Sequence, residues 1–288
     1  MAEKVLVAGA GGRLGRHLLK ELAARGYGVR AMVSDPCTMA GEDLDVFACD
    51  ARNPESLAGA CEGVQLVVSA MGGSLALRYT PPKASYRDVD LSANLNLLAE
   101  ARRAGVRKFV YVSLYGAEAL RGLAYVDAHE EFVAALRSSG MGHAVVRPTG
   151  FFYVFGEIFR MAARGRAFLV GDGRARTNPI HESDVARACA DAVASDETEL
   201  AVGGPEVYTR REATELAFRA LGRPPKITSL PTGLVGTLIA PVKLLDRRLY
   251  DLLAFGVAVG TNDVVAPRYG TRSLAEYFRR MAAGAPEV

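Results

Sequence analysis

The sequence contains no tryptophan and only four cysteines among its 288 residues, Cys37, Cys49, Cys61 and Cys189. These cysteines lie far apart and lack the spacing of a metal-ligand set, which argues against a metal site and against a disulfide framework. We therefore interpret them as reduced side chains that pack as small hydrophobes.

Neither sign of charge dominates, because 35 Lys and Arg residues are mixed with 32 Asp and Glu residues. The absence of a basic stripe argues against a nucleic-acid partner. The longest apolar stretch, Gly233 to Leu245, is interrupted by Pro241 and Lys243 and is too short to span a bilayer. Since a strand-like run begins at Lys4, little room remains for a secretion signal. We expect a cytoplasmic protein without an integral membrane segment.

The first half of the sequence alternates short β-branched runs with amphipathic stretches. This rhythm predicts an α/β fold in which helices cover both faces of a parallel sheet. The expected strands are Val5–Ala8, Val29–Val33, Val46–Cys49, Leu66–Ala70, Phe109–Ser113 and His143–Arg147. The expected helices are Arg13–Arg25, Pro54–Ala60, Ala84–Ala104 and Tyr125–Ser138.

The pattern loosens after Arg147, where short strands mix with helices and Pro224, Pro225 and Pro231 punctuate an apolar segment. We expect two parts, a cofactor-binding domain over residues 1–150 and a smaller C-terminal α/β substrate lobe over residues 151–288. The second part would close over the ends of the strands, in a monomer or a homodimer.

A glycine loop follows the first expected strand and opens the first expected helix, with glycines at 9, 12 and 15 in a G-x-x-G-x-x-G pattern. Glycines in this position permit a tight turn, close approach of the backbone to a pyrophosphate and close packing of the helix on the strand. The helix N-terminus offers N–H groups to the phosphates. The loop predicts a dinucleotide cofactor in contact with Gly9, Gly11, Gly12, Arg13, Leu14 and Gly15.

The end of the second strand bears on the choice between NAD and NADP. An acidic residue at its tip would bind the adenine ribose and exclude a 2′-phosphate. Here Asp35 lies beyond the expected tip, while Ser34 and Arg13 are placed to receive the extra phosphate, so we expect NADP, with NAD possible. Asp50 ends the third strand, before Ala51, and either reaches the adenine amino group or caps a helix.

These motifs together resemble the short-chain dehydrogenase/reductase superfamily, in its extended or atypical NmrA-like branch. The resemblance rests on the glycine loop, on Tyr111-Val112-Ser113, on Arg147-Pro148-Thr149-Gly150, and on Asn178-Pro179-Ile180-His181 before Asp184-Val185-Ala186. It implies a Rossmann-type doubly wound sheet and covers most of the chain.

In that superfamily a serine, a tyrosine and a lysine four residues after the tyrosine form the reductase centre. The resemblance places Ser113 and Tyr125 at the first two positions and puts His129 where the lysine is expected. Residues four apart share a helix face, so Tyr125 and His129 can point at the same ribose. A histidine supplies positive charge only part of the time at neutral pH, so its help to the phenol should be weaker. The alternative is a packed phenol beside a surface imidazole.

Two further segments are expected beside the cofactor. Ala70, Met71 and Gly72 follow the fourth strand and either pass along the phosphates and ribose or form a plain glycine turn. Pro148, Thr149 and Gly150 match a segment whose backbone lies along the nicotinamide in relatives.

The substrate side is apolar. The aromatic run from Phe151 to Phe155 is suited either to walling a pocket or to packing a helix on the sheet. The apolar stretch from Leu230 to Phe255 is suited to a lid, to core packing or to a membrane surface. We expect an NAD(P)H-dependent oxidoreductase acting on a small apolar carbonyl, quinone or enone. The alternative, favoured by the missing lysine, is a non-catalytic NAD(P)-binding sensor or scaffold.

Overall fold

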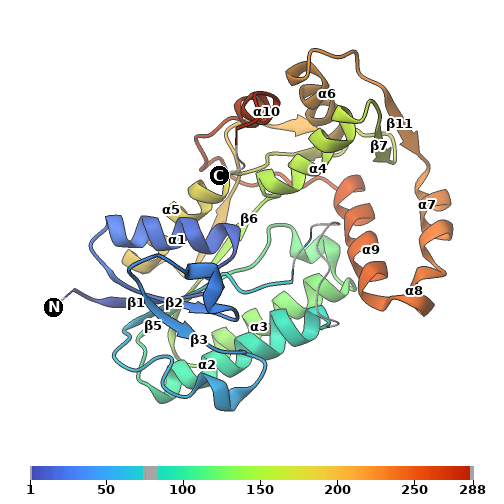
Figure 1. Cartoon of the computed structure of the whole chain (residues 1–288). Helices are drawn as coiled ribbons and strands as arrows, with labels where there is room; N and C mark the ends of the chain where they lie inside the picture. Colours follow the sequence, from blue (N-terminus) through green and yellow to red (C-terminus); the bar gives the residue numbers. More distant parts are fainter. Residues whose placement is uncertain (1, 74, 76–83, 286–288) are drawn as a thin grey trace.

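The computed structural model describes residues 2–73, 75 and 84–285, and its main feature is a sheet of seven parallel strands (Figure 1). Apolar β-branched runs bounded by glycines form these strands, as the sequence predicts. In sheet order the strands are β3 (Asp45–Ala48), β2 (Gly28–Val33), β1 (Lys4–Ala8), β4 (Leu66–Ser69), β5 (Lys108–Val112), β6 (Gly142–Pro148) and β9 (Glu199–Val202). The predicted doubly wound parallel sheet is therefore confirmed.

Alternation along the strands divides the core into two layers. Val5 and Val7 belong to one buried cluster, and Leu6 and Ala8 belong to another on the opposite face. The residues alternate because successive side chains of a strand point to opposite faces. The first face is covered by α1 (Arg13–Ala24) and α5 (Glu182–Ala194), and the second by α2 (Ala93–Arg103) and α3 (Ala124–Ser138).

Two expected helices differ from the prediction. The segment expected as a helix over 54–60 forms only a short 3₁₀ turn, η2 (Pro54–Leu57), because Gly59 adopts a positive φ of 83° that ends it. The long helix expected over 84–104 begins as a π-helix, η3 (Arg87–Ser92), before α2. Such wide turns occur mostly as single turns and often at functional sites.

The C-terminal half builds a smaller lobe around buried phenylalanines, among them Phe152, Phe155 and Phe218. Its elements are α4 (Phe152–Ala163), α6 (Arg210–Ala220) and α10 (Leu274–Ala282), with the strand pairs β7 (Ala167–Val170) with β11 (Ile227–Leu230) and β8 (Arg176–Thr177) with β10 (Tyr208–Thr209). The same half also supplies α5 and β9 to the main layers. A division at residue 150 therefore places one strand of the main sheet and one helix that covers it on the C-terminal side.

The apolar segment after β11 forms three helices, α7 (Thr232–Ile239), α8 (Val242–Leu245) and α9 (Arg247–Thr261). Figure 1 shows them as a hairpin with α8 at its turn and α9 returning beside α3. Among the described helices, none combines the length and the apolar character that crossing a bilayer requires.

Candidate cofactor and active site

A groove of about 500 Å³ lies at the carboxyl ends of β1, β2, β3 and β4. Ligands of open parallel sheets bind outside this edge, near the point where the strand order reverses. Here the order reverses between β1 and β4, which are neighbours in the sheet. Nine of the residues predicted to contact the cofactor line the groove, namely Gly9, Gly11, Gly12, Ser34, Asp50, Ala51, Ala70, Met71 and Gly72.

The glycine loop fits a pyrophosphate because side chains are excluded from it. Gly9 has a positive φ of 78°, and its N–H donates to the Met32 carbonyl oxygen at 3.2 Å. A Cβ on Gly15 would lie 2.7 Å from Ala10 Cα and closer still to the Gly9 carbonyl oxygen, so only glycine lets α1 pack here. Among the described residues, no side chain caps α1 at Gly12. The first N–H groups of the helix therefore remain available for phosphate oxygens.

Three predicted loop residues lie outside the groove. Gly15 packs against the backbone of Gly9 and Ala10, and Leu14 packs against the core. Arg13 lines a separate pocket with Arg16 and His17, and its guanidinium lies 5.6 Å from the centre of the Tyr153 ring. The sequence predicts that Arg13 receives the 2′-phosphate in the groove. In the structure the first turn of α1 directs its side chain toward the C-terminal lobe instead.

At the end of the groove where we expect the adenine, Asp35 lies two residues beyond β2 and accepts a hydrogen bond from the Cys37 N–H at 2.9 Å. Asp50 binds Arg52 through both carboxylate oxygens, at 2.7 and 2.8 Å. This ion pair holds the pKa of Asp50 below its ordinary value. The Asp50 carboxylate thus faces Arg52, which also lines the groove and which the sequence analysis did not select.

The loop after β4 is fixed by a buried acid that the sequence analysis missed. Asp90, in the π-helix, accepts from the Gly73 N–H at 3.0 and 3.1 Å. One turn later Asn94 donates to the Asp90 carbonyl oxygen and accepts from the Ser69 hydroxyl at 2.6 Å. The wall of the groove at Met71 and Gly72 is therefore built by side chains from η3 and α2. A signal was present, since Asp90 and Asn94 are four residues apart on one helix.

Tyr125 and His129 lie together on α3, as their spacing predicts, with ring centres 4.5 Å apart. Tyr86 and Phe255 also contact the Tyr125 ring, at 5.2 and 4.9 Å. Burial raises the pKa of Tyr125 well above its ordinary value, and the nearby Asp90 carboxylate raises it further. The phenol is therefore held in its protonated form at neutral pH.

The imidazole of His129 lies between Tyr111 and Asp90. It is buried, its Nδ1 shares a 2.6 Å hydrogen bond with the Tyr111 hydroxyl, and its Nε2 lies 3.1 Å from an Asp90 carboxylate oxygen. Among the described residues, Nε2 has no hydrogen-bond partner despite this short distance. The role of His129 as a ribose ligand stays a prediction, and β5 and η3 enclose its imidazole.

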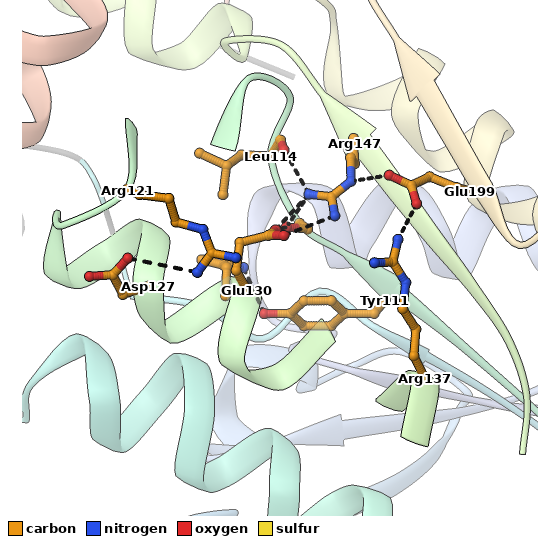
Figure 2. Close-up of polar contacts among 10 residues, drawn as sticks. Tyr111, Leu114, Arg121, Asp127, Glu130, Arg137, Arg147 and Glu199 are labelled. Carbon is orange, nitrogen blue, oxygen red and sulfur yellow. Dashed lines mark hydrogen bonds and ion pairs between the residues drawn. The ribbon is translucent and has the colours of Figure 1, made fainter. Parts of the chain in front are cut away.

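Ser113 belongs to a different polar network, whose ion pair between Glu130 and Arg147 is drawn in Figure 2. Its hydroxyl donates to Glu130 at 3.0 Å and accepts from Arg147 at 3.3 Å. Arg147 binds Glu130 at 2.6 Å and also pairs with Glu199 of β9. Burial tends to raise the pKa of Glu130, but Arg147 and the Ser113 hydroxyl outweigh it and lower this pKa. Ser113 is therefore held by an ion pair that ties α3 to the sheet.

The segment Pro148-Thr149-Gly150, at the end of β6, also contacts other parts of the protein. Thr149 donates its hydroxyl to the Asn178 carbonyl oxygen at 2.6 Å, and Gly150 lies against the Phe155 ring. Pro148 ends β6, and none of Pro148, Thr149 and Gly150 is among the residues that line the groove. Phe152 and Phe155 belong to the core of the C-terminal lobe, which supports their interpretation as packing residues.

The sequence analysis also missed Arg248, which α9 brings to the groove from the far end of the chain. Its guanidinium donates to the Ala84 carbonyl oxygen at 2.7 Å and lies 5.2 Å from the centre of the Tyr86 ring. Arg248 and Phe255 thus place α9 beside both the cofactor groove and Tyr125. No local sequence pattern predicts this contact, because 164 residues separate Arg248 from Ala84.

Comparison with known proteins agrees with this geometry. A family model described as NAD(P)H-binding matches residues 9–196. The chain is 31% identical over 267 residues to 3-diazoavenalumate denitrifying reductase of Streptomyces sp, covering 82% of this chain and 87% of that protein. It is 28% identical over 319 residues to the chloroplastic divinyl chlorophyllide a 8-vinyl-reductase of Cucumis sativus, covering 96% of this chain and 75% of that protein. A cytoplasmic location for the present chain stays a prediction.

The fold is shared with a solved reductase. The NADPH-dependent quinone oxidoreductase of Escherichia coli, in complex with NADPH, is 20% identical and superposes with a TM-score of 0.76 over 96% of this chain and 99% of that chain. This structure confirms the predicted Rossmann fold, and the family model confirms the predicted dinucleotide cofactor and superfamily. The chain belongs to the NAD(P)H-binding, atypical NmrA-like branch of the short-chain dehydrogenase/reductase superfamily, a family of the oxidoreductase type.

Proposed function

We propose that this protein is an NADPH-preferring reductase of an apolar quinone, enone or carbonyl compound, with Tyr125 as the proton donor. The observation that carries the proposal is the position of the Tyr125 phenol, which lies at the family's tyrosine position between Tyr86 and Phe255. A half-buried phenol beside an apolar wall is placed to protonate a flat substrate that accepts a hydride.

The bound cofactor would supply the hydride, a pair of electrons with a proton, to one carbon of the substrate. Tyr125 would donate a proton to the oxygen or carbon on which negative charge develops, and solvent would restore the phenol. Asp90 would hold the Gly73 loop against the cofactor while it fixes the ring of His129 beside Tyr125. Gly9, Gly11 and Gly12 would hold the pyrophosphate.

The preference for NADPH is supported by the end of β2. The position after the strand is Ser34, which lines the groove together with Asp35 and Thr38, and the Asp35 carboxylate accepts from the Cys37 N–H. An acidic residue that binds the adenine ribose would disfavour the 2′-phosphate. The names of the relatives, a vinyl reductase, a denitrifying reductase and a quinone oxidoreductase, support reduction as the reaction class.

One observation favours a second candidate, a cofactor-binding sensor or scaffold without turnover. His129 replaces the family lysine, and both its nitrogens face Tyr111 and Asp90. A protein without turnover has no need of a cation beside its tyrosine.

The two candidates differ in their response to Tyr125→Phe. We expect tight binding of NADPH, weaker binding of NADH, and oxidation of NADPH by at least one member of a panel of quinones, enones and aromatic ketones. Tyr125→Phe should lower kcat about 100-fold with an unchanged Kd for NADPH, because only the proton donor is lost. Tyr27→Phe, beside the opposite end of the sheet, is the matched control and should keep full activity. Binding without oxidation across the panel would select the sensor, and turnover unaffected by Tyr125→Phe would exclude the proposed acid.

A further inference from the structure

The hairpin of α7, α8 and α9 exposes large apolar side chains to an extent unmatched in the described part of the chain. Five leucines on the hairpin, at positions 234, 238, 244, 245 and 249, are 50, 65, 90, 88 and 40% exposed. Only four other large hydrophobic side chains are classed as exposed among the described residues, and those are scattered over separate elements. Exposed apolar side chains gathered on one hairpin point to an interaction surface.

The exposed leucines do not form the face that packs on the rest of the protein. Phe255, Ala258 and Val259 of α9 make that contact, against a buried cluster that contains Leu114 and Val126. Leu244 and Leu245 lie in α8, which Figure 1 shows at the turn of the hairpin. The hairpin is therefore anchored by α9 and presents its leucines outward.

The charges of the hairpin have a small basic excess, three cations (Lys243, Arg247 and Arg248) against two acids (Asp246 and Asp251). Lys243 is the only charged residue between Ile227 and Leu245. Asp246 accepts from the Leu249 N–H at 2.9 Å, and Asp251 pairs with Arg247 at 3.1 Å. Lys243 and Arg247 are exposed and flank the leucine tip. An apolar tip with flanking cations matches the chemistry of an anionic lipid surface.

We propose that this hairpin seats the protein on the surface of a bilayer that contains anionic lipids. Leu244 and Leu245 would enter the boundary between headgroups and acyl chains, and Lys243 would face the lipid phosphates, with Arg247 beside it in its ion pair with Asp251. The hairpin would lie in the interface and not cross it, since its helices are short. Because the inner face of α9 reaches Tyr125, the bilayer would lie at the mouth of the proposed site, where an apolar substrate dissolves in the lipid. The binding itself does not depend on the reductase chemistry.

Flotation of the full chain with vesicles tests the proposal. We expect the protein to float with vesicles of phosphatidylcholine mixed with phosphatidylglycerol, to float less with phosphatidylcholine alone, and to be released partly by high salt. The double variant Leu244→Asp, Leu245→Asp should lose at least tenfold in bound fraction, while Lys243→Glu with Arg247→Glu should lose mainly the preference for anionic lipid. Val207→Asp is the matched control, because Val207 is 53% exposed but lies outside the hairpin, and it should float like the wild type.

The leucine variant should keep its NADPH affinity and melting temperature, which shows that the fold is intact. Wild-type protein that fails to float with either vesicle would overturn the proposal, and so would equal flotation of the leucine variant. Light scattering of the protein in solution tests the alternative that a second copy of this chain covers the leucines. A wild-type dimer that the leucine variant dissociates would assign the patch to a second copy of this chain and refute the lipid surface.

Discussion

Replacing Gly15 by alanine isolates the contribution of backbone packing in the cofactor loop. The added Cβ would lie 2.7 Å from Ala10 Cα, while carbon atoms in favourable contact are about 3.5–4.0 Å apart. The loop or the helix must therefore move by about 1 Å. The neighbours are backbone atoms, which cannot rotate away as a side chain would.

Two effects of opposite sign compete in this variant. Alanine is a better helix former than glycine by about 1 kcal/mol, which would stabilise α1. Overpacking against backbone costs up to about 3 kcal/mol. We expect the clash to win, with a net loss of about 2 kcal/mol and a fall in melting temperature of about 4 °C. The displaced loop should also raise the Kd for NADPH at least tenfold, which corresponds to about 1.4 kcal/mol.

Thermal unfolding without cofactor and a fluorescence titration with NADPH measure both effects. Gly28→Ala is the control, because its Cβ would meet ordinary contacts of 3.8 Å or more at the start of β2. That variant should change neither quantity. A Gly15→Ala protein that is more stable than the wild type, and that binds NADPH equally well, would refute the packing argument for the loop.

Two further predictions follow from buried groups. Glu130→Gln should destabilise the protein by about 3 kcal/mol in urea unfolding at pH 7, because it leaves the buried Arg147 charge partly uncompensated. The lowered pKa of Glu130 means that its ion pair stabilises the fold above the ordinary carboxyl pKa and is lost as the pH falls through the folded value. The difference between variant and wild type should therefore shrink below about pH 4, and a constant difference would contradict this assignment. For the thiols, a disulfide reagent should label exposed Cys37 fastest in the folded protein, since burial raises the pKa of Cys49 to about 11 and of Cys61 to about 12. Labelling of Cys49 or Cys61 in the folded protein as fast as in the unfolded protein would refute this prediction.

The parts of the fold that the sequence predicts correctly are those set by local patterns. Each strand of the first half is a short apolar run, and glycines such as Gly9, Gly26 and Gly105 adopt the positive φ that ends or begins an element. The cofactor groove is predictable for the same reason, since the glycine loop is continuous in sequence and forms one wall.

The catalytic centre is harder to predict because its partners come from distant segments. The spacing places Tyr125 and His129 on one face, but it cannot show that Asp90 and Tyr111 enclose the imidazole. Likewise Ser113 matches the family position, yet its hydroxyl is held by Glu130 and Arg147. These outcomes depend on which charged groups the tertiary fold buries together.

The position of β9 has a consequence for the order in which the protein is made. Strand β6 ends at Pro148, and its neighbour β9 ends at Val202, about fifty residues later. At the usual speed of translation the ribosome needs roughly 3–10 s for this interval. Until then the nascent sheet has an open edge along β6, and the face of α1 that meets α5 is bare, which invites pairing with other chains. Because β9 and α5 come from the later half, the sheet that carries the cofactor site is complete only after most of the chain has been synthesised.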